Sequence, residues 1–311
     1  MQDVTDLAFM RTLARLGSLP DLLVTPYFRS TPTTCALAEQ NLRCLQENET
    51  GVPILAQLAG SEAAALVRDA RMLDTPAAAG INLNAGCPSP LVNRHGAGAG
   101  LLRDLPNFRR ILHALREAVP AGRFSVKCRL GWADAAEFPE ILAALAEAAP
   151  DMVMIHARTR KELYSGTPQM AYVREAVTAL PCPVLANGDL NTAAEVHACL
   201  AATGAAGAML GRGAVRNPYL FRELRGGAAP TADELNTYYA VLLEETGRIL
   251  NNYTEKGHCN RMKKYLTFCY PDMSTEQEYA LRRCTGVKEM ERQMVCTKYE
   301  VNNNLTESQK S

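Results

Sequence analysis

Short apolar runs recur along the first two thirds of the chain, and segments with helical periodicity separate them. The runs lie at 22–25, 53–58, 80–83, 124–128, 152–155, 183–186 and 207–210. In the segments between them apolar residues return at every third or fourth position, as at Phe108, Ile111 and Leu115. Alternation of strand and helix at about 30 residues per unit is typical of parallel crossover connections. The seven runs therefore predict an α/β fold over residues 1–225, a (β/α)8 TIM barrel lacking its first strand.

A change of composition near residue 226 marks the end of this pattern. The segment GGAAP at 226–230 is a candidate linker, and the apolar residues after it have helical spacing without strand-like runs. These residues include Leu235, Tyr238, Tyr239, Leu242, Leu243, Met262, Tyr265, Leu266 and Cys269. We therefore predict a small helical domain over residues 231–305.

The composition excludes several classes of protein. The 33 basic and 33 acidic side chains leave no net charge to attract nucleic acid or an anionic membrane, so any RNA binding requires a local basic surface. The ten cysteines form no C-x-x-C pair, and the apolar runs are far shorter than the roughly 20 residues of a membrane span. We expect a cytoplasmic protein with reduced thiols, no membrane contact, no metal and no need to form oligomers.

The segment INLNAGCPSPLVNRHGAGAGLL at 81–102 holds the first candidate for chemistry. An apolar run ends at Asn84, and Cys87 follows between a glycine and a proline. This order puts a thiol just beyond the carboxyl end of a strand, where barrel enzymes keep their catalytic groups. A thiol that stays protonated can donate a proton as well as attack. Most isolated cysteines are inert core residues, and we predict this for Cys128, whose side chain alternates away from that of Lys127.

Cationic side chains accompany the next two runs. Lys127 stands inside an apolar strand, where a charge is costly without an anionic partner, and Arg129 shares its face. His156 and Arg158 follow the run at 152–155. Two simpler interpretations are a lysine that reaches solvent at a strand end and a histidine that serves as a structural donor. Because these strands end at one rim, we expect the side chains to meet there and to bind an anion or a substrate.

Two glycine turns follow the last two runs. They are Asn187-Gly188-Asp189 and Gly211-Arg212-Gly213, and each alone indicates only a tight turn. In a barrel, however, these two loops usually bind phosphate, through backbone N–H groups and here through the Arg212 guanidinium.

Two further features lie near the same rim. Gln57 and Asn84 stand at strand ends, and their amides can pair with the edges of a heterocycle. The run GAGAG at 96–100 is separated from the preceding strand by about a dozen residues, whereas a dinucleotide fingerprint opens a helix directly after a strand. We expect this run to shape the loop that carries Cys87.

The segment around Cys87 resembles the signature of the tRNA-dihydrouridine synthases, flavin enzymes that reduce particular uridines in transfer RNA. Further similar segments are AQL at 56–58, SVKCRLGW at 125–132, MIHARTR at 154–160, LANGD at 185–189 and LGRGAVRNPYLF at 210–221. Their order is the family's order, and the ordered set is more specific than any single motif. The resemblance implies a TIM barrel, FMN as cofactor, NADPH as reductant and tRNA as substrate.

The resemblance also implies roles for individual residues. Cys87 would protonate C5 of the uracil while reduced flavin gives a hydride to C6. Asn84 would bind the uracil, and Arg129 and Arg158 would contact the substrate. The implied flavin contacts are Gln57, Lys127, His156, Asn187, Gly188, Asp189, Gly211 and Arg212.

In the family a first strand ends in A-P-M just before a sequence like QDVTD, and its following loop lies against the flavin. Here Met1 stands where that methionine would be. Met1 is therefore an expected flavin contact. Either the start has been assigned too late, or the chain begins inside the barrel, and an open barrel leaves strand edges unpaired.

In the tail, Arg261 and Lys264 fall three residues apart on one helix face. The segment HCNRMKKYL at 258–266 resembles the helix with which the family grips tRNA, although an ordinary solvated face has the same pattern.

Two other functions fit parts of the sequence. One is an FMN-dependent reductase of a free pyrimidine or another small substrate, which requires no helical tail. The other is an RNA-binding remnant without FMN, which would not need Cys87, Lys127 or His156.

Overall fold

The structure of the protein, a computed structural model, describes residues 4–33, 36–269 and 275–294. Its centre is a parallel sheet of eight strands. The strands are β1 (Leu23–Val24), β2 (Phe28–Arg29), β3 (Ile54–Ala59), β4 (Gly80–Ala85), β5 (Phe124–Arg129), β6 (Met152–His156), β7 (Val184–Asn187) and β8 (Gly207–Ala208). Each of the seven predicted runs contains a strand, so that prediction is confirmed, whereas the two-residue β2 was not foreseen.

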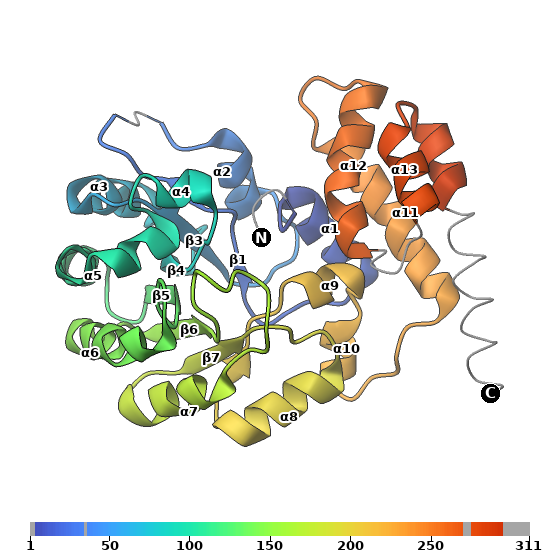
Figure 1. Ribbon diagram of the computed structural model, residues 1–311. Helices are drawn as coiled ribbons and strands as arrows, with labels where there is room; N and C mark the ends of the chain where they lie inside the picture. Colours follow the sequence, from blue (N-terminus) through green and yellow to red (C-terminus); the bar gives the residue numbers. More distant parts are fainter. Residues whose placement is uncertain (1–3, 34–35, 270–274, 295–311) are drawn as a thin grey trace.

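Helices cover the outer face of this sheet, as Figure 1 shows. The helices between residues 4 and 225 are α1 (Leu7–Leu16), α2 (Glu39–Gln46), α3 (Ala63–Leu73), α4 (Pro90–Asn93), α5 (Leu105–Ala118), α6 (Phe138–Ala148), α7 (Met170–Ala179), α8 (Ala193–Thr203), α9 (Arg212–Arg216) and α10 (Leu220–Leu224), with 3-10 helices η1 (Gly98–Arg103) and η2 (Ala135–Glu137). Of these, α3, α5, α6, α7 and α8 cover the outer face. The strand order runs β1-β3-β4-β5-β6-β7-β8, with β2 also paired to β3, and within the described ranges no ladder joins β8 to β1. This is the predicted (β/α)8 architecture without its first strand.

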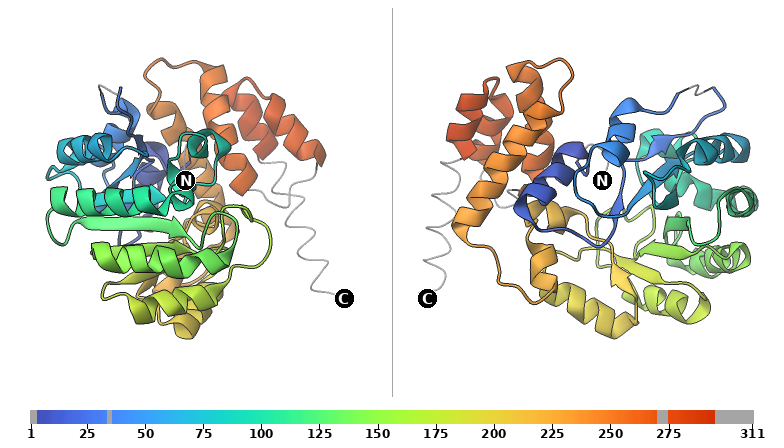
Figure 2. Two further views of the ribbon diagram at one scale, coloured as in Figure 1. Left: turned by 60° about the vertical axis from the view of Figure 1, so that its left-hand side comes forward. Right: turned by 180° about the vertical axis from the view of Figure 1, so that it is seen from behind.

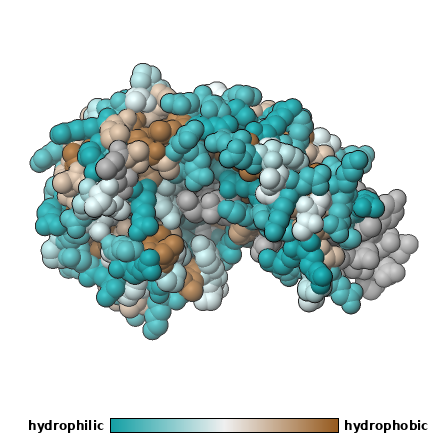
Figure 3. Space-filling model, turned by 90° about the horizontal axis from the view of Figure 1, so that it is seen from above, coloured by the Kyte–Doolittle hydropathy of each residue, from teal (hydrophilic) through white to brown (hydrophobic). Residues whose placement is uncertain are grey.

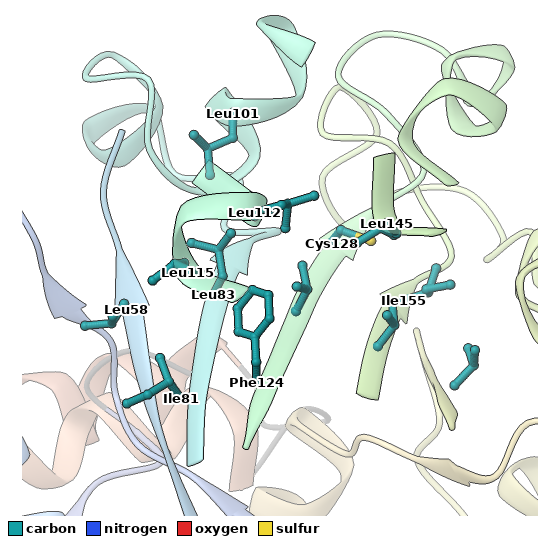
Figure 4. Packing of buried hydrophobic residues seen from close by; sticks show 14 of the residues in the cluster. Leu58, Ile81, Leu83, Leu101, Leu112, Leu115, Phe124, Cys128, Leu145 and Ile155 are labelled. Carbon is teal, nitrogen blue, oxygen red and sulfur yellow. The ribbon is translucent and has the colours of Figure 1, made fainter. Parts of the chain in front are cut away.

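The main hydrophobic core lies between the strands and their covering helices. Figure 4 shows Phe124 of β5 and Leu112 of α5 in this layer, with Cys128 beside Leu145 of α6. Cys128 is fully buried, and burial raises the pKa of its thiol to about 12. The prediction of an inert core cysteine is therefore confirmed.

The tail forms α11 (Ala232–Arg248), α12 (Glu255–Cys269), α13 (Thr275–Arg283) and a helical segment at 287–294. Its apolar faces build a second core together with Phe9 and Leu13 of α1. In Figures 1 and 2, α1 lies between the barrel and the tail helices. Residues 270–274 and 295–305 of the predicted tail domain lie outside the described ranges.

The face seen in Figure 3 is mostly hydrophilic, and the larger hydrophobic patches on that face lie over the barrel. Within the ranges that the structure describes, no helix has both the length and the apolar character needed to cross a membrane.

Candidate active site

Cys87 lies two residues beyond the end of β4, and its backbone is fixed on both sides. Its N–H donates to Oδ1 of Asn84 at 2.9 Å. Its carbonyl accepts from Nδ2 of Asn93 at 2.8 Å and from the N–H of Ala99 at 3.0 Å. The half-buried thiol is therefore carried on a rigid support at the carboxyl end of the barrel.

The run GAGAG packs directly against this support. Gly98 has φ +61°, and a Cβ atom there would stand 2.9 Å from the Cys87 carbonyl oxygen and 3.0 Å from its Cβ. The run leads into η1 and not into an α-helix after a strand. It shapes the loop of Cys87, as predicted, because only glycine combines this backbone conformation with so close an approach.

We expect Gly98→Ala to displace Cys87. Gly122→Ala is the matched control, since Gly122 also has a positive φ, +81°, but has open space around its Cα. Both variants should lose about 1 kcal/mol of unfolding free energy to backbone strain, measured by thermal unfolding. Gly98→Ala should lose more, because its methyl group also crowds Cys87. Gly98→Ala alone should change the alkylation rate of Cys87, measured by peptide mass spectrometry. Equal rates in the two variants would show that the loop absorbs the extra methyl group.

A buried network of amides lies beneath the cysteine loop. Asn84 donates to Oε1 of Gln57 at 2.9 Å, Gln57 donates to Oδ1 of Asn82 at 2.8 Å, and Asn82 donates to Oγ of Ser125 at 2.9 Å. Asn84 Oδ1 also accepts from the N–H of Gly86 at 3.0 Å. The structure thus brings Gln57 and Asn84 together, and Asn84 fixes the cysteine loop.

Sequence reasoning missed Asn82 and Ser125. A signal was present, because Asn82 and Asn84 stand two apart on β4, as do Ser125 and Lys127 on β5. Polar residues at this spacing share one face of a strand. Here that face points into the barrel.

Two cations of β5 enter the site. Lys127 donates from Nζ to Oδ1 of Asn187 at 3.1 Å, and burial, together with Arg129, lowers the pKa of its amine to about 8. Arg129 is 1% exposed and donates to the carbonyls of Gly86 at 2.9 Å, Thr159 at 2.7 Å and Leu163 at 2.8 Å. Arg129 therefore joins the cysteine loop to the loop after β6.

The loop after β6 brings in His156 and Arg158. Burial, followed by the charge of Lys127 and the nearby arginines, lowers the pKa of His156 to about 2. Its buried Nε2 has no hydrogen-bond partner in the described part of the chain, and the same holds for Nη1 of Arg158. Arg158 otherwise donates to the carbonyls of Ser165 and Gly166 and to the carboxylate of Asp189. Two buried polar atoms are thus available to a ligand.

The two glycine turns meet beside these cations. Asn187 donates to the Met209 carbonyl at 2.7 Å, which ties the loop after β7 to β8. Asp189, at φ 47°, accepts from Arg158 and from Arg212, the latter at 2.5 Å, and its hydrogen bond with Arg158 is the main reason that its pKa is lowered. Gly188 has φ +135°, and a Cβ there would stand 3.1 Å from Pro168. Gly211 precedes α9, which Arg212 begins.

Tyr164 is a further residue that sequence reasoning missed. It is 54% exposed, yet the guanidinium carbons of Arg212 and Arg129 lie 4.8 Å and 5.6 Å from its ring centre. The His156 ring lies 6.2 Å from it. An aromatic side chain shortly after the R-T-R segment was the available signal.

We call the rim formed by the loops after β4 to β8 the mouth of the barrel. Its basic side chains outnumber its acidic ones. Four cations act on His156, namely Lys127, Arg129, Arg158 and Arg212. The acidic neighbours are Asp189, paired with Arg158 and Arg212, and Glu162, which acts on Arg129. Together with the two unpartnered buried atoms, this excess of positive charge suits an anionic ligand.

Two predicted residues, Arg261 and Lys264, lie outside this rim. Arg261 of α12 forms an ion pair with Asp6, whose carboxylate also caps α1 and accepts from Tyr265. This pair lines a cavity of about 110 Å³ between α1, α2 and α12. Lys264 is exposed on the same helix, and Met1 lies outside the described residues.

Comparison with known proteins assigns a family to this arrangement. The family model described as dihydrouridine synthase matches residues 1–305. The chain is 35% identical to the tRNA-dihydrouridine(16) synthase of Cupriavidus necator, over 78% of this chain and 77% of that one. It is 32% identical to the tRNA-dihydrouridine(16) synthase of Shewanella oneidensis, over 73% and 72%.

Among solved structures, the old yellow enzyme homologue of Zymomonas mobilis has a similar fold, with a TM-score of 0.52 at 12% identity. The match covers 73% of this chain and 86% of that one. With its family model matched across almost the whole length, this chain belongs to the dihydrouridine synthase family.

Proposed function

We propose that this protein is a tRNA-dihydrouridine synthase, which reduces the C5–C6 double bond of specific uridines in tRNA with FMN as cofactor and NADPH as reductant. The observation that carries the proposal is the Cys87 thiol, held by its backbone at the rim of a mouth rich in cations. Family membership and the names of the two relatives support it. Because both relatives are named for position 16, we expect the product at position 16.

The residues of the mouth fit FMN. Its phosphate would lie against Gly211, Arg212 and the Asn187–Asp189 turn, where the two guanidinium groups of Arg158 and Arg212 face the single carboxylate of Asp189. Lys127 is a buried cation whose partner is the neutral amide of Asn187, so an anionic ring edge would stabilise its charge. His156 and Gln57 would flank the ring. When bound, FMN supplies the hydride that is added to C6 of the uracil.

Cys87 would supply the proton. It gives the proton from Sγ to C5, and the thiolate is then reprotonated from solvent. In the ranges that the structure describes, Sγ makes no hydrogen bond, so its proton is not held by another group of the protein. Hydride at C6 and proton at C5 together saturate the double bond.

The uridine would reach this site by flipping out of its stack, because C5 and C6 are inaccessible inside folded RNA. Asn84 would then meet the base, with Arg129 and Arg158 at the same rim. Tyr164 offers an exposed ring on which a base can stack. Lys264, exposed on α12, would contact tRNA phosphates from the tail, which positions the RNA without reading its sequence. The predicted phosphate contact of Arg261 would require its ion pair with Asp6 to open.

The test has two stages. Purified protein is first mixed with FMN, freed of the excess and examined by visible absorbance, and we expect the flavin bands to remain. NADPH oxidation is then followed with unmodified tRNA and with free uracil, and dihydrouridine is mapped in the RNA. Turnover on tRNA alone supports the proposal. Turnover on uracil alone would identify a reductase of free pyrimidines, and a colourless, inactive protein would favour an RNA-binding remnant.

A further inference from the structure

Asn93 is hydrogen-bonded to Cys87 from the end of the same loop. It is the last residue of α4, is 3% exposed, and both polar atoms of its side chain form hydrogen bonds. Nδ2 donates to the carbonyls of Cys87 at 2.8 Å and Ala97 at 3.0 Å, and Oδ1 accepts from Nε of Arg160 at 3.1 Å. One amide thus joins the cysteine peptide, the glycine run and a cation from another loop.

Arg160 is itself anchored to the loop after β5. Its N–H donates to the Gly131 carbonyl at 2.8 Å, and its guanidinium carbon lies 4.6 Å from the ring centre of Trp132. The guanidinium of Arg103, from η1, lies 4.9 Å from the same ring. Since three loops meet at this point, Arg160 presents its Nε in a fixed direction to Asn93.

We infer that Asn93 and Arg160 are positioning residues for the Cys87 thiol. The inference rests on the proposed function, in which Cys87 is the proton donor. The Cys87 carbonyl adjoins the Cα that carries the thiol, so a rotation of this peptide moves Sγ. A misplacement of about 1 Å in a reacting group can cost roughly 100-fold in rate. Asn84 fixes the N–H side of Cys87, and Asn93 with Arg160 fixes the carbonyl side.

The test variant is Asn93→Asp, which keeps the shape of the side chain but removes both N–H donors. A carboxylate there would face two carbonyl oxygens and repel them. The matched control is Asn48→Asp, because Nδ2 of Asn48 also donates to two carbonyls, those of Cys44 at 3.0 Å and Leu45 at 3.3 Å. Oδ1 of Asn48 accepts from the N–H of Thr50 at 3.0 Å, at the end of α2 and away from the site.

We expect Asn93→Asp to lower kcat on tRNA by roughly 10- to 100-fold, with the KM for tRNA and the flavin spectrum little changed. Asn48→Asp should keep the kcat of the wild type. A second readout is the alkylation rate of Cys87, followed by peptide mass spectrometry in FMN-loaded protein without RNA. This rate should change in Asn93→Asp and not in Asn48→Asp.

The half-buried Arg160 gives an independent test if Asn93→Asp does not fold. Arg160→Ala should change kcat and the alkylation rate each in the same direction as Asn93→Asp does. Arg160→Lys, which keeps a donor, should restore part of both. A lower melting temperature with unchanged kcat and alkylation rate would overturn the inference and leave Asn93 a structural residue.

The alkylation rate also separates this inference from the proposed function. If Cys87→Ala keeps full activity, the proton-donor role fails, yet the alkylation rate still reports whether Asn93 and Arg160 position the thiol. If Cys87→Ala is inactive and Asn93→Asp leaves both readouts unchanged, only the positioning role fails.

Discussion

Cys87→Ala should abolish dihydrouridine formation while the protein still folds and retains FMN. The thiol is half-buried, its Sγ makes no hydrogen bond within the described ranges, and its backbone contacts do not depend on the side chain. Loss of a general acid typically costs about 100- to 10,000-fold in rate. The measurement is single-turnover formation of dihydrouridine in tRNA by enzyme reduced beforehand with NADPH.

The matched control is Cys182→Ala, another partly exposed cysteine, which lies in the turn before β7. It should form product at the wild-type rate. Undiminished product in Cys87→Ala, with flavin bound, would remove the cysteine from the proton-donor role.

Lys127→Met should weaken FMN binding and lower turnover by about 100-fold or more, because it removes a buried cation at the centre of the mouth. The amine has a lowered pKa of about 8, so the free protein carries this charge fully only below that pH. An anionic ligand raises the pKa of the amine. FMN affinity should therefore be steady from pH 7 to 8 and weaken as pH rises further.

Flavin fluorescence titrations at several pH values measure the affinity for FMN. The weakening above about pH 8 should disappear in Lys127→Met and remain in Lys256→Met, which removes an exposed charge from the tail. A curve for Lys127→Met that follows the wild type would show that another group is responsible.

The free energy of unfolding of the FMN-free protein depends on pH through the same residue, but in the opposite direction to the affinity for FMN. The folded-state pKa of Lys127 is lower than the usual 10.5 of an unfolded chain, so the unfolded state binds more protons between about pH 8 and 10.5. Through this group, the free energy of unfolding rises with pH across that window. The free protein thus bears a cost at neutral pH that a bound anion would relieve.

The strands and the rim residues could be predicted because each rests on a local signal. Seven apolar runs were enough to order the sheet, and the strand ends then placed Cys87, Lys127 and His156 at one rim. The burial of Cys128 followed from alternation along β5.

What could not be predicted depends on contacts between distant segments. The ion pair of Arg261 with Asp6 joins residues 255 positions apart, and no spacing rule reports it. Arg129 stays a predicted substrate contact, but the hydrogen bonds of its guanidinium to carbonyls of two loops were not foreseen. A sequence shows that a buried arginine needs acceptors, but not which carbonyls will provide them.

The depressed basicity of His156 has a consequence for how the mouth attracts RNA. Most histidines gain charge as the pH falls from 8 to 5, and a site that contains one then becomes more positive. With a pKa of about 2, this imidazole stays neutral throughout that range. The positive potential at the rim therefore does not change with pH through this ring. In mildly acidic surroundings the ring adds nothing to the attraction of the mouth for a polyanion.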